Sequence, residues 1–167
     1  AAPLPANVHR FPAGRVGNFE HQRDGKTIAR IQGVSRSAGH PPDDSGFHRD
    51  AKGLFTIGVA HGTAASAGSE GDRVHYMALG GRHVQQTVDE QPGIAHYSGT
   101  PQGRAPAETG IHGCTVITVD ETGRAKLRFV ATDVVRWSEQ VLEVTATTRS
   151  EQLHERMVER LEKLRAA

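Results

Sequence analysis

Two short apolar segments, each followed by glycine and histidine, constrain this chain of 167 residues more than any other feature. Residues 54–60 (LFTIGVA) lead into His61, and residues 75–79 (HYMAL) lead through two glycines to His83. Short apolar runs bounded by glycine predict strands buried on both faces, as in parallel sheets covered by helices. Parallel strands end at a common edge, where α/β folds place ligand sites. We therefore expect His61 and His83 to lie close together.

The remaining pattern predicts more strands and one helix. We expect strands at 7–11, 27–34, 94–97, 114–119, 125–130 and 141–145, with a hairpin turn at 120–123. A capping box of Thr148 and Glu151 opens an amphipathic helix at about 149–165. Strands buried on both faces need helices to cover them, so either helices lie in weakly patterned segments or part of the fold is missing.

Composition excludes several classes of protein. Twenty Lys and Arg against nineteen Asp and Glu give a net charge of +1, which excludes a nucleic-acid binder held by bulk charge but not a local phosphate site. The single cysteine, Cys114, cannot form an intrachain disulfide, which favours a reducing, cytoplasmic compartment; we expect it in the core of a strand. No apolar run approaches the roughly 18 residues of a membrane helix, so we expect no membrane contact.

His61 and His83 are candidate metal ligands, because neutral imidazole suits Mn, Fe, Zn or Ni. Spacing alone also fits two unrelated loop histidines that are hydrogen-bonded to backbone, since no local metal-ligand interval applies. A candidate phosphate site lies in the segment YSGTPQGR at 97–104, whose hydroxyls, glycine amides and guanidinium are suited to phosphate. The same segment also fits an ordinary turn-rich connection. The candidate phosphate-binding residues are Arg82, Ser98, Thr100, Gln102 and Arg104.

An ordered series of motifs resembles the C-terminal half of a calcineurin-like metallophosphoesterase domain. The series is IGVAHG at 57–62, YMALGGRH at 76–83 and IAHYSGTPQGRAPAETGIHGCTVITVD at 94–120. Within that superfamily the chain resembles the SbcD-like DNA repair exonucleases over roughly residues 7–146, and DVVRW at 133–137 resembles a later strand of the same domain. Residues 94–120 are the most specific part.

The resemblance implies an α/β fold, part of a four-layer α/β/β/α sandwich, of which this chain is mostly β with a C-terminal helix. It implies two metal ions, usually Mn²⁺, whose bridging hydroxide attacks phosphorus. Carried over, His61 is the ligand of the fourth metal-binding motif and His83 the final ligand of the fifth. The implied partners are DNA and an SMC-like ATPase of the SbcC type. We expect residues 1–146 to form the half domain and 147–167 to begin a linker or cap.

Two departures from the family pattern matter. The chain has no Asp-x-His, no Gly-Asn-His and no Gly-Asp at the place where the family needs one. The general acid is therefore expected in a missing N-terminal half, and this chain alone is expected to be inactive. Gly81 stands where a metal-binding histidine is expected, which weakens one metal site. The alternatives are a phosphoesterase for small nucleotides or phosphoproteins, a scaffold module with a decayed metal site, and a β-rich domain with coincidental motifs.

Overall fold

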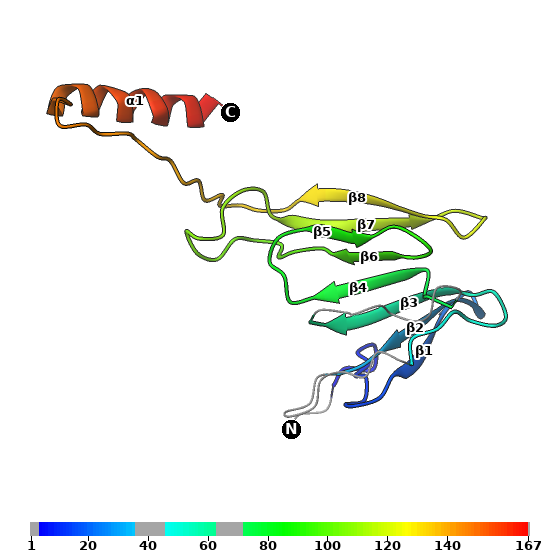
Figure 1. Cartoon of the computed structure of the whole chain (residues 1–167). Coiled ribbons are helices and arrows are strands. Elements are labelled where there is room, and N and C mark those ends of the chain that lie inside the picture. The colour runs from blue at the N-terminus through cyan, green and yellow to red at the C-terminus, as the bar shows by residue number, and fades with distance from the viewer. Residues whose placement is uncertain (1–3, 36–45, 63–71, 167) are drawn as a thin grey trace.

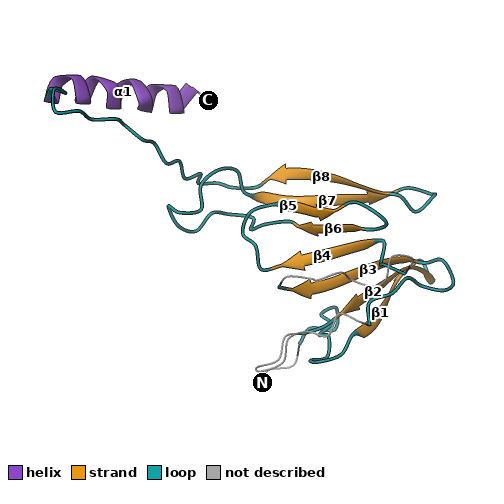
Figure 2. Cartoon of the chain, in the orientation of Figure 1, coloured by secondary structure: helices purple, strands orange, loops and turns teal. Residues whose placement is uncertain are grey.

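Two sheets and one helix make up the part of the chain described by the computed structural model, residues 4–35, 46–62 and 72–166 (Figures 1 and 2). A six-stranded sheet has the order β1-β2-β3-β4-β6-β5, and a two-stranded sheet pairs β7 with β8. The strands are β1 (Gly17–Arg23), β2 (Lys26–Gly33), β3 (Phe55–His61), β4 (Tyr76–Gly80), β5 (Gln86–Asp89), β6 (Ile94–Tyr97), β7 (Gly113–Val119) and β8 (Ala125–Ala131). The helix α1 (Ser150–Ala166) follows at the C-terminal end, so the predicted α/β class is confirmed.

The centre of the larger sheet is parallel. Strand β3 pairs in parallel with β2 on one side and β4 on the other, and β4 pairs in parallel with β6. The register of β3 and β4 runs from Ile57 opposite Tyr76 to His61 opposite Gly80. The two apolar segments that dominate the sequence are therefore adjacent parallel strands that end at one edge, as predicted.

The core lies on one face of this sheet. Val34, Phe47, Val74, Met77, Leu79 and Tyr97 form the cluster of buried apolar side chains. Met77 and Phe47 occupy the space that a side chain at position 58 of β3 would need, which favours glycine there. A Cβ atom at Gly58 would lie 2.7 Å from Met77 Sδ. The next residue, Val59, has 37% of its surface exposed.

The expectation that 54–60 is buried on both faces is therefore wrong for the described residues. Burial alternates along β3, with Thr56 and Gly58 inside and Val59 exposed. Alternating burial is what a pleated strand shows when only one of its faces is covered. Within the described ranges no helix packs over the second face; the single helix stands away from the sheets (Figure 1).

Strands β7 and β8 form the predicted hairpin, and a buried histidine links it to the larger sheet. At the turn, Asp120 Oδ1 accepts hydrogen bonds from the backbone N–H groups of Thr122 and Arg124. On β6, His96 Nε2 lies 2.8 Å from Thr115 Oγ1 of β7, and its Nδ1 lies 3.0 Å from Thr87 Oγ1 of β5. His96 is 1% exposed, and the two threonine hydroxyls provide hydrogen-bond partners for both of its ring nitrogens.

Several local predictions are wrong. Residues 7–11 and 141–145 form no strand, and 133–137 contributes only an isolated bridge between Thr109 and Trp137. Conversely, β1 and β5 were not predicted: they are edge strands whose residues are mostly exposed, so neither carries an apolar alternation to detect. Cys114 lies exposed on β7 instead of in the core, because the two-stranded sheet leaves its outer face uncovered.

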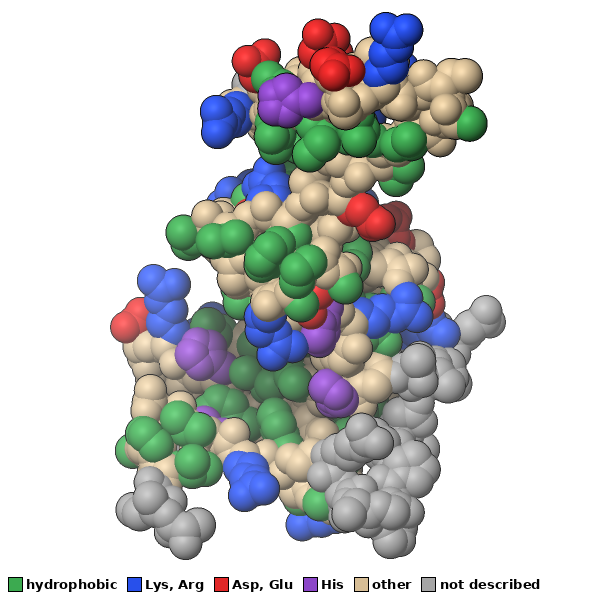
Figure 3. Space-filling model, turned by 90° about the vertical axis from the view of Figure 1, so that its left-hand side faces the viewer, with side chains coloured by type: hydrophobic (Ala, Val, Ile, Leu, Met, Phe, Trp, Pro, Cys, Tyr) green, Lys and Arg blue, Asp and Glu red, His purple; other side chains and the backbone are tan. Residues whose placement is uncertain are grey.

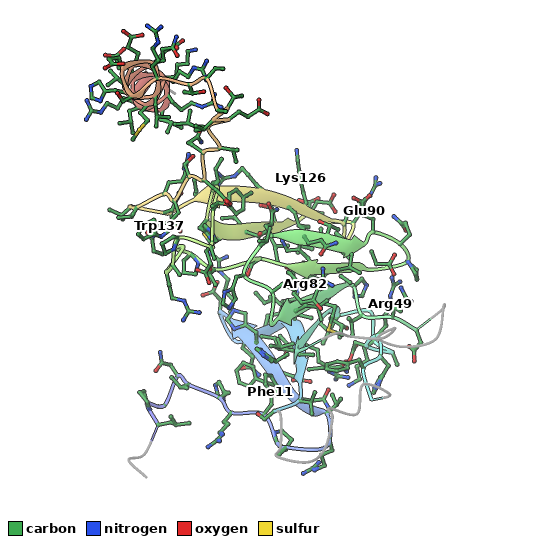
Figure 4. The ribbon with its side chains drawn as sticks, turned by 60° about the vertical axis from the view of Figure 1, so that its left-hand side comes forward. Phe11, Arg49, Arg82, Glu90, Lys126 and Trp137 are labelled. Atoms are coloured by element: carbon green, nitrogen blue, oxygen red, sulfur yellow. The ribbon has the colours of Figure 1, made fainter. Side chains whose placement is uncertain are left out.

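The predicted helix is present, but its cap differs. Gln152 Oε1 accepts the N–H of Arg149 at 3.1 Å, whereas the Thr148 hydroxyl accepts the N–H of Thr145. Figures 1 and 4 show α1 standing apart from both sheets, and none of residues 150–165 is buried. Its apolar side borders a groove that is lined by Met157, Leu161 and Leu164 of the helix and by Leu142 of the preceding segment. No helix in the described ranges is both long enough and apolar enough to span a bilayer.

Burial of His96 predicts that acid destabilises the fold. Burial lowers the pKa of His96 below the usual value of about 6.5, because imidazolium is poorly solvated there. The unfolded chain therefore takes up a proton at higher pH than the folded chain. The stability that neutral His96 contributes is complete above about pH 6.5 and is lost as the pH falls through the folded pKa.

We expect the free energy of unfolding to decrease from about pH 7.5 to about pH 5.5, on either side of that usual pKa, and to decrease less in His96→Gln. Urea denaturation at several pH values measures both slopes. Burial and the charge of Arg49 lower the pKa of His75 as well, so the variant keeps part of the slope. Equal slopes in the two proteins would show that His96 does not titrate in this way.

Candidate functional site

The candidate site begins where β3 and β4 end. Gly62 N–H donates to Gly80 O at 2.9 Å, which continues the pairing beyond His61. The His61 ring lies against the two glycines: a Cβ atom at Gly80 would be 2.9 Å from His61 Nδ1, and one at Gly81 would be 3.5 Å from Nε2. Gly80 thus leaves space for the imidazole at the sheet edge, whereas a Cβ atom at Gly81 would be in ordinary contact with it. Position 81, where the resemblance expects a metal-binding histidine, is next to His61.

The backbone at Gly81 favours glycine for its own reason. Its φ angle is +108°, a conformation that residues with a Cβ atom rarely adopt. Glycine in place of the histidine that the resemblance expects therefore goes together with a turn that disfavours a side chain. Of the two expected ligands in the fifth motif, only His83 is available.

An apolar hollow borders His61 at the edge of the sheet. Its lining residues are Phe11, Val34, Ser35, Val59, Ala60, His61, Ala78, Leu79 and Gly80. Figure 3 looks onto the side at which β3 and β4 end and shows hydrophobic side chains flanked by histidine and by Lys or Arg. The site therefore combines imidazole, positive charge and apolar surface at one edge.

His83 lies in the turn after β4, with its side chain 47% exposed. Its Nδ1 is hydrogen-bonded to Glu108 Oε1. The other oxygen of that carboxylate, Oε2, accepts the backbone N–H of Arg104 at 2.6 Å. The Arg104 amide first, and then the hydrogen bond to His83, lower the pKa of Glu108 below its usual range, so this carboxyl group is ionised at neutral pH.

The loop after β6 closes around the His83 turn. Thr100 N–H donates to His83 O at 3.0 Å, and the Thr100 hydroxyl lies 2.9 Å from His112 Nδ1. Gly99 has a φ angle of +77°, and a Cβ atom there would be 2.8 Å from His83 O. This close approach requires glycine. Folding thereby brings the segment 98–108 to His83.

The candidate phosphate-binding residues differ in their surroundings. The Arg82 guanidinium stacks over the Tyr97 ring, 5.0 Å from its centroid, and lies near the centre of the molecule in Figure 4. Arg104 is exposed, and Ser98 Oγ makes only a long contact of 3.5 Å with Gly99 O. The structure gathers Arg82, Thr100 and the Arg104 backbone around His83. None of these contacts tests phosphate binding, which stays a prediction.

Gln102 is occupied by the protein itself. Its Oε1 accepts the N–H groups of Val134 and Val135, and its Nε2 donates to Val135 O and Gly103 O. Trp137 Nε1 donates to the same Gly103 carbonyl. In this arrangement the Gln102 amide fixes the segment after β8 and has no free group directed to a ligand.

Three further residues of the site were not singled out as candidates from the sequence. Glu108 holds His83, His112 connects Thr100 to the Glu108 backbone, and the Tyr97 hydroxyl donates to Gly62 O at 2.7 Å. The one signal in the sequence was the Glu-x-Gly at 108–110 within the most specific motif. Its partner lies 25 residues earlier, so spacing did not reveal the pair.

The donor chemistry fits part of a metal site. His61 and His83 offer neutral imidazoles, and an imidazole backed by a carboxylate, as His83 is, is typical of metal ligands. Among the described residues no group of three or more His, Cys, Asp or Glu is arranged to hold a metal ion. The two histidines are therefore suited to be metal donors, but the described residues alone complete no metal site.

A mixed sheet with histidines at the ends of its parallel strands agrees with a fragment of a metallophosphoesterase fold. No family model matches the chain. The chain is similar to the uncharacterized metallophosphoesterase YhaO of Bacillus subtilis (strain 168), with 27% identity over 177 aligned positions. The alignment covers 96% of this chain and 43% of that relative, so the chain spans less than half of the relative's length. This similarity supports the resemblance to the calcineurin-like superfamily.

Gly81→Ala tests the requirement for glycine beside His61. We expect a loss of about 1–2 kcal/mol in the free energy of unfolding, because a residue with a Cβ atom is strained at positive φ. The matched control is Gly123→Ala in the β7–β8 turn, which has a φ of +79° and no atom within 4 Å of a new Cβ. Urea denaturation gives the energies, and NMR shifts of the His61 ring are expected to change only in the first variant. A Gly81→Ala protein as stable as the wild type would contradict this turn geometry.

Proposed function

We propose that this chain supplies the C-terminal half of a metal-dependent phosphodiesterase domain, and that the complete domain hydrolyses phosphodiester bonds in DNA. The observation that carries the proposal is the parallel pairing of β3 with β4, which sets His61 against Gly80 and Gly81 with His83 in the next turn. Such an edge is where α/β sheets hold ligands. The similarity to a metallophosphoesterase supports phosphoester hydrolysis in general.

In this proposal His61 and His83 hold divalent cations through their imidazole nitrogens. When bound, two such ions supply an activated water and neutralise negative charge on the phosphoryl group. Arg82 and Arg104 attract the phosphate oxygens of the substrate, because guanidinium groups form charge-assisted hydrogen bonds with phosphate. Thr100 holds the His83 turn in place through its N–H bond to the His83 carbonyl.

The proposal also specifies the substrate, the metal ion, the protein partner and the cellular location. Segment 94–120 resembles the SbcD-like exonucleases, which favours DNA as substrate, Mn²⁺ as metal and an SMC-like ATPase as partner. A single cysteine is in line with a cytoplasmic location. The general acid and the remaining ligands belong to the N-terminal half of the domain, which we propose as the essential partner of residues 1–146.

We expect His61→Ala and His83→Ala to reduce Mn²⁺-dependent hydrolysis of duplex DNA by the complete domain at least about a hundredfold. The basis is that loss even of a residue supporting a metal ligand typically costs 10–100-fold. Release of labelled nucleotides from duplex DNA is the measurement. His154→Ala, on the exposed helix α1, is the matched control and is expected to retain full activity. Unchanged hydrolysis in both variants would remove His61 and His83 from the reaction.

A phosphoesterase for small nucleotides or phosphoproteins uses the same residues, and the net charge of +1 favours it over a DNA enzyme. Competition between duplex DNA and a small phosphodiester in the same assay separates the two. Strong inhibition of diester hydrolysis by DNA supports the DNA enzyme, and no inhibition supports the small substrate.

The turn at Gly81 favours a second candidate function, a binding module with a decayed metal site. A glycine at φ +108° replaces an expected ligand, and the described residues contain no complete donor group. Metal analysis of the purified complete domain distinguishes the two functions. Two ions per domain exclude the decayed site, and none favours it.

A further inference from the structure

We propose that Glu108 is a positioning residue that holds the proton of the His83 imidazole on Nδ1 and leaves the Nε2 lone pair free for a cation. The proposal rests on the proposed function for the identity of the cation, but not for the state of the ring. The structural basis is the hydrogen bond between His83 Nδ1 and Glu108 Oε1.

Each oxygen of the Glu108 carboxylate takes part in one hydrogen bond. Oε2 accepts the N–H of Arg104 at 2.6 Å, and Oε1 faces His83 Nδ1. An ionised carboxylate can only accept hydrogen bonds, so the proton between Glu108 and His83 belongs to the ring. A neutral His83 is thereby the Nδ1–H tautomer, and its Nε2 carries the lone pair that ligates metals.

A buried histidine fixes the loop that carries Glu108. His112, 4% exposed, has its Nε2 3.3 Å from Glu108 O and its Nδ1 2.9 Å from the Thr100 hydroxyl. A carbonyl oxygen can only accept, so His112 donates from Nε2. The Thr100 hydroxyl lies 2.9 Å from His112 Nδ1 and 3.3 Å from His83 O. Thr100 N–H in turn binds the His83 carbonyl. The carboxylate and the imidazole are thus held by the same loop.

Stability alone does not account for the hydrogen bond between His83 and Glu108, because His83 is about half exposed and polar pairs at such exposure add little to the free energy of unfolding. The Glu108 side chain, by contrast, is only 17% exposed and has both of its oxygens occupied. An oriented carboxylate behind an accessible imidazole is the arrangement that fixes the tautomer of metal-ligating histidines.

Glu108→Gln separates positioning from packing. The glutamine side chain has nearly the same shape but only one acceptor oxygen in place of two. Because His83 Nδ1 and the Arg104 N–H contact different oxygens of Glu108, that one oxygen can reach only one of them. If that oxygen stays on Arg104, the amide NH₂ faces His83 Nδ1 and donates to it. The ring proton then moves to Nε2, which blocks the nitrogen assigned to the cation.

The test is ¹⁵N–¹H correlation NMR of histidine side chains in the metal-free 167-residue chain at a pH where His83 is neutral. We expect wild-type His83 to be the Nδ1–H tautomer. In Glu108→Gln we expect the majority of His83 to be the Nε2–H tautomer. The control Glu121→Gln, in the exposed β7–β8 turn, is expected to match the wild type. A wild-type His83 protonated on Nε2 overturns the proposal, and this measurement needs no variant to fold. An unchanged tautomer in a folded Glu108→Gln protein overturns it as well.

A Mn²⁺ titration of the complete domain by electron paramagnetic resonance tests the consequence. We expect Glu108→Gln to weaken Mn²⁺ binding by about 10–100-fold and Glu121→Gln to leave it unchanged. If His83→Ala weakens binding and Glu108→Gln does not, the positioning role is overturned while the proposed function stands. If the tautomer responds to Glu108→Gln but His83→Ala leaves Mn²⁺ affinity unchanged, the metal role of His83 in the proposed function fails and the ring-positioning role is supported.

Discussion

The parallel pairing of β3 with β4 is the constraint on which the rest of this structure depends. It buries Met77 and Leu79 against Phe47, and it sets His61 opposite Gly80 at the carboxyl edge. Gly80 at that edge lets the imidazole lie against the backbone, and the chain then turns at Gly81 and brings His83 to the loop after β6. Core packing and the placement of chemistry thus follow from one set of backbone hydrogen bonds.

The sheet is covered unevenly in the described residues, and its polar groups are satisfied accordingly. On the covered face the Asp50 carboxylate is paired with Arg30 and accepts the N–H groups of Lys52 and Leu54. On the other face Val59 is exposed beside His61. A half-covered parallel sheet is unusual, because such sheets normally bury both faces. This agrees with a chain that spans less than half the length of the relative it matches.

Sequence patterns succeeded where burial is strong and failed where it is weak. The apolar runs that became β3, β4 and β6 and the β7–β8 hairpin were predicted, as was α1. The edge strands β1 and β5 were missed because backbone pairing with one neighbour leaves no requirement for apolar side chains. Residues 141–145 have the composition of a strand, but they pair with no described strand, and Leu142 lines a groove together with residues of α1.

The sequence by itself determined that His61 and His83 lie at or just after the ends of two apolar strands, because apolar runs and glycines are local signals. That these strands are adjacent and parallel is a result of the tertiary structure. Only the tertiary structure decided that Glu108 lies behind His83, that Gln102 is occupied by the segment after β8, and that Gly81 has a left-handed backbone. These contacts join residues tens of positions apart or depend on a single dihedral angle. Neither a long-range contact nor a single dihedral angle produces a periodic pattern in the sequence.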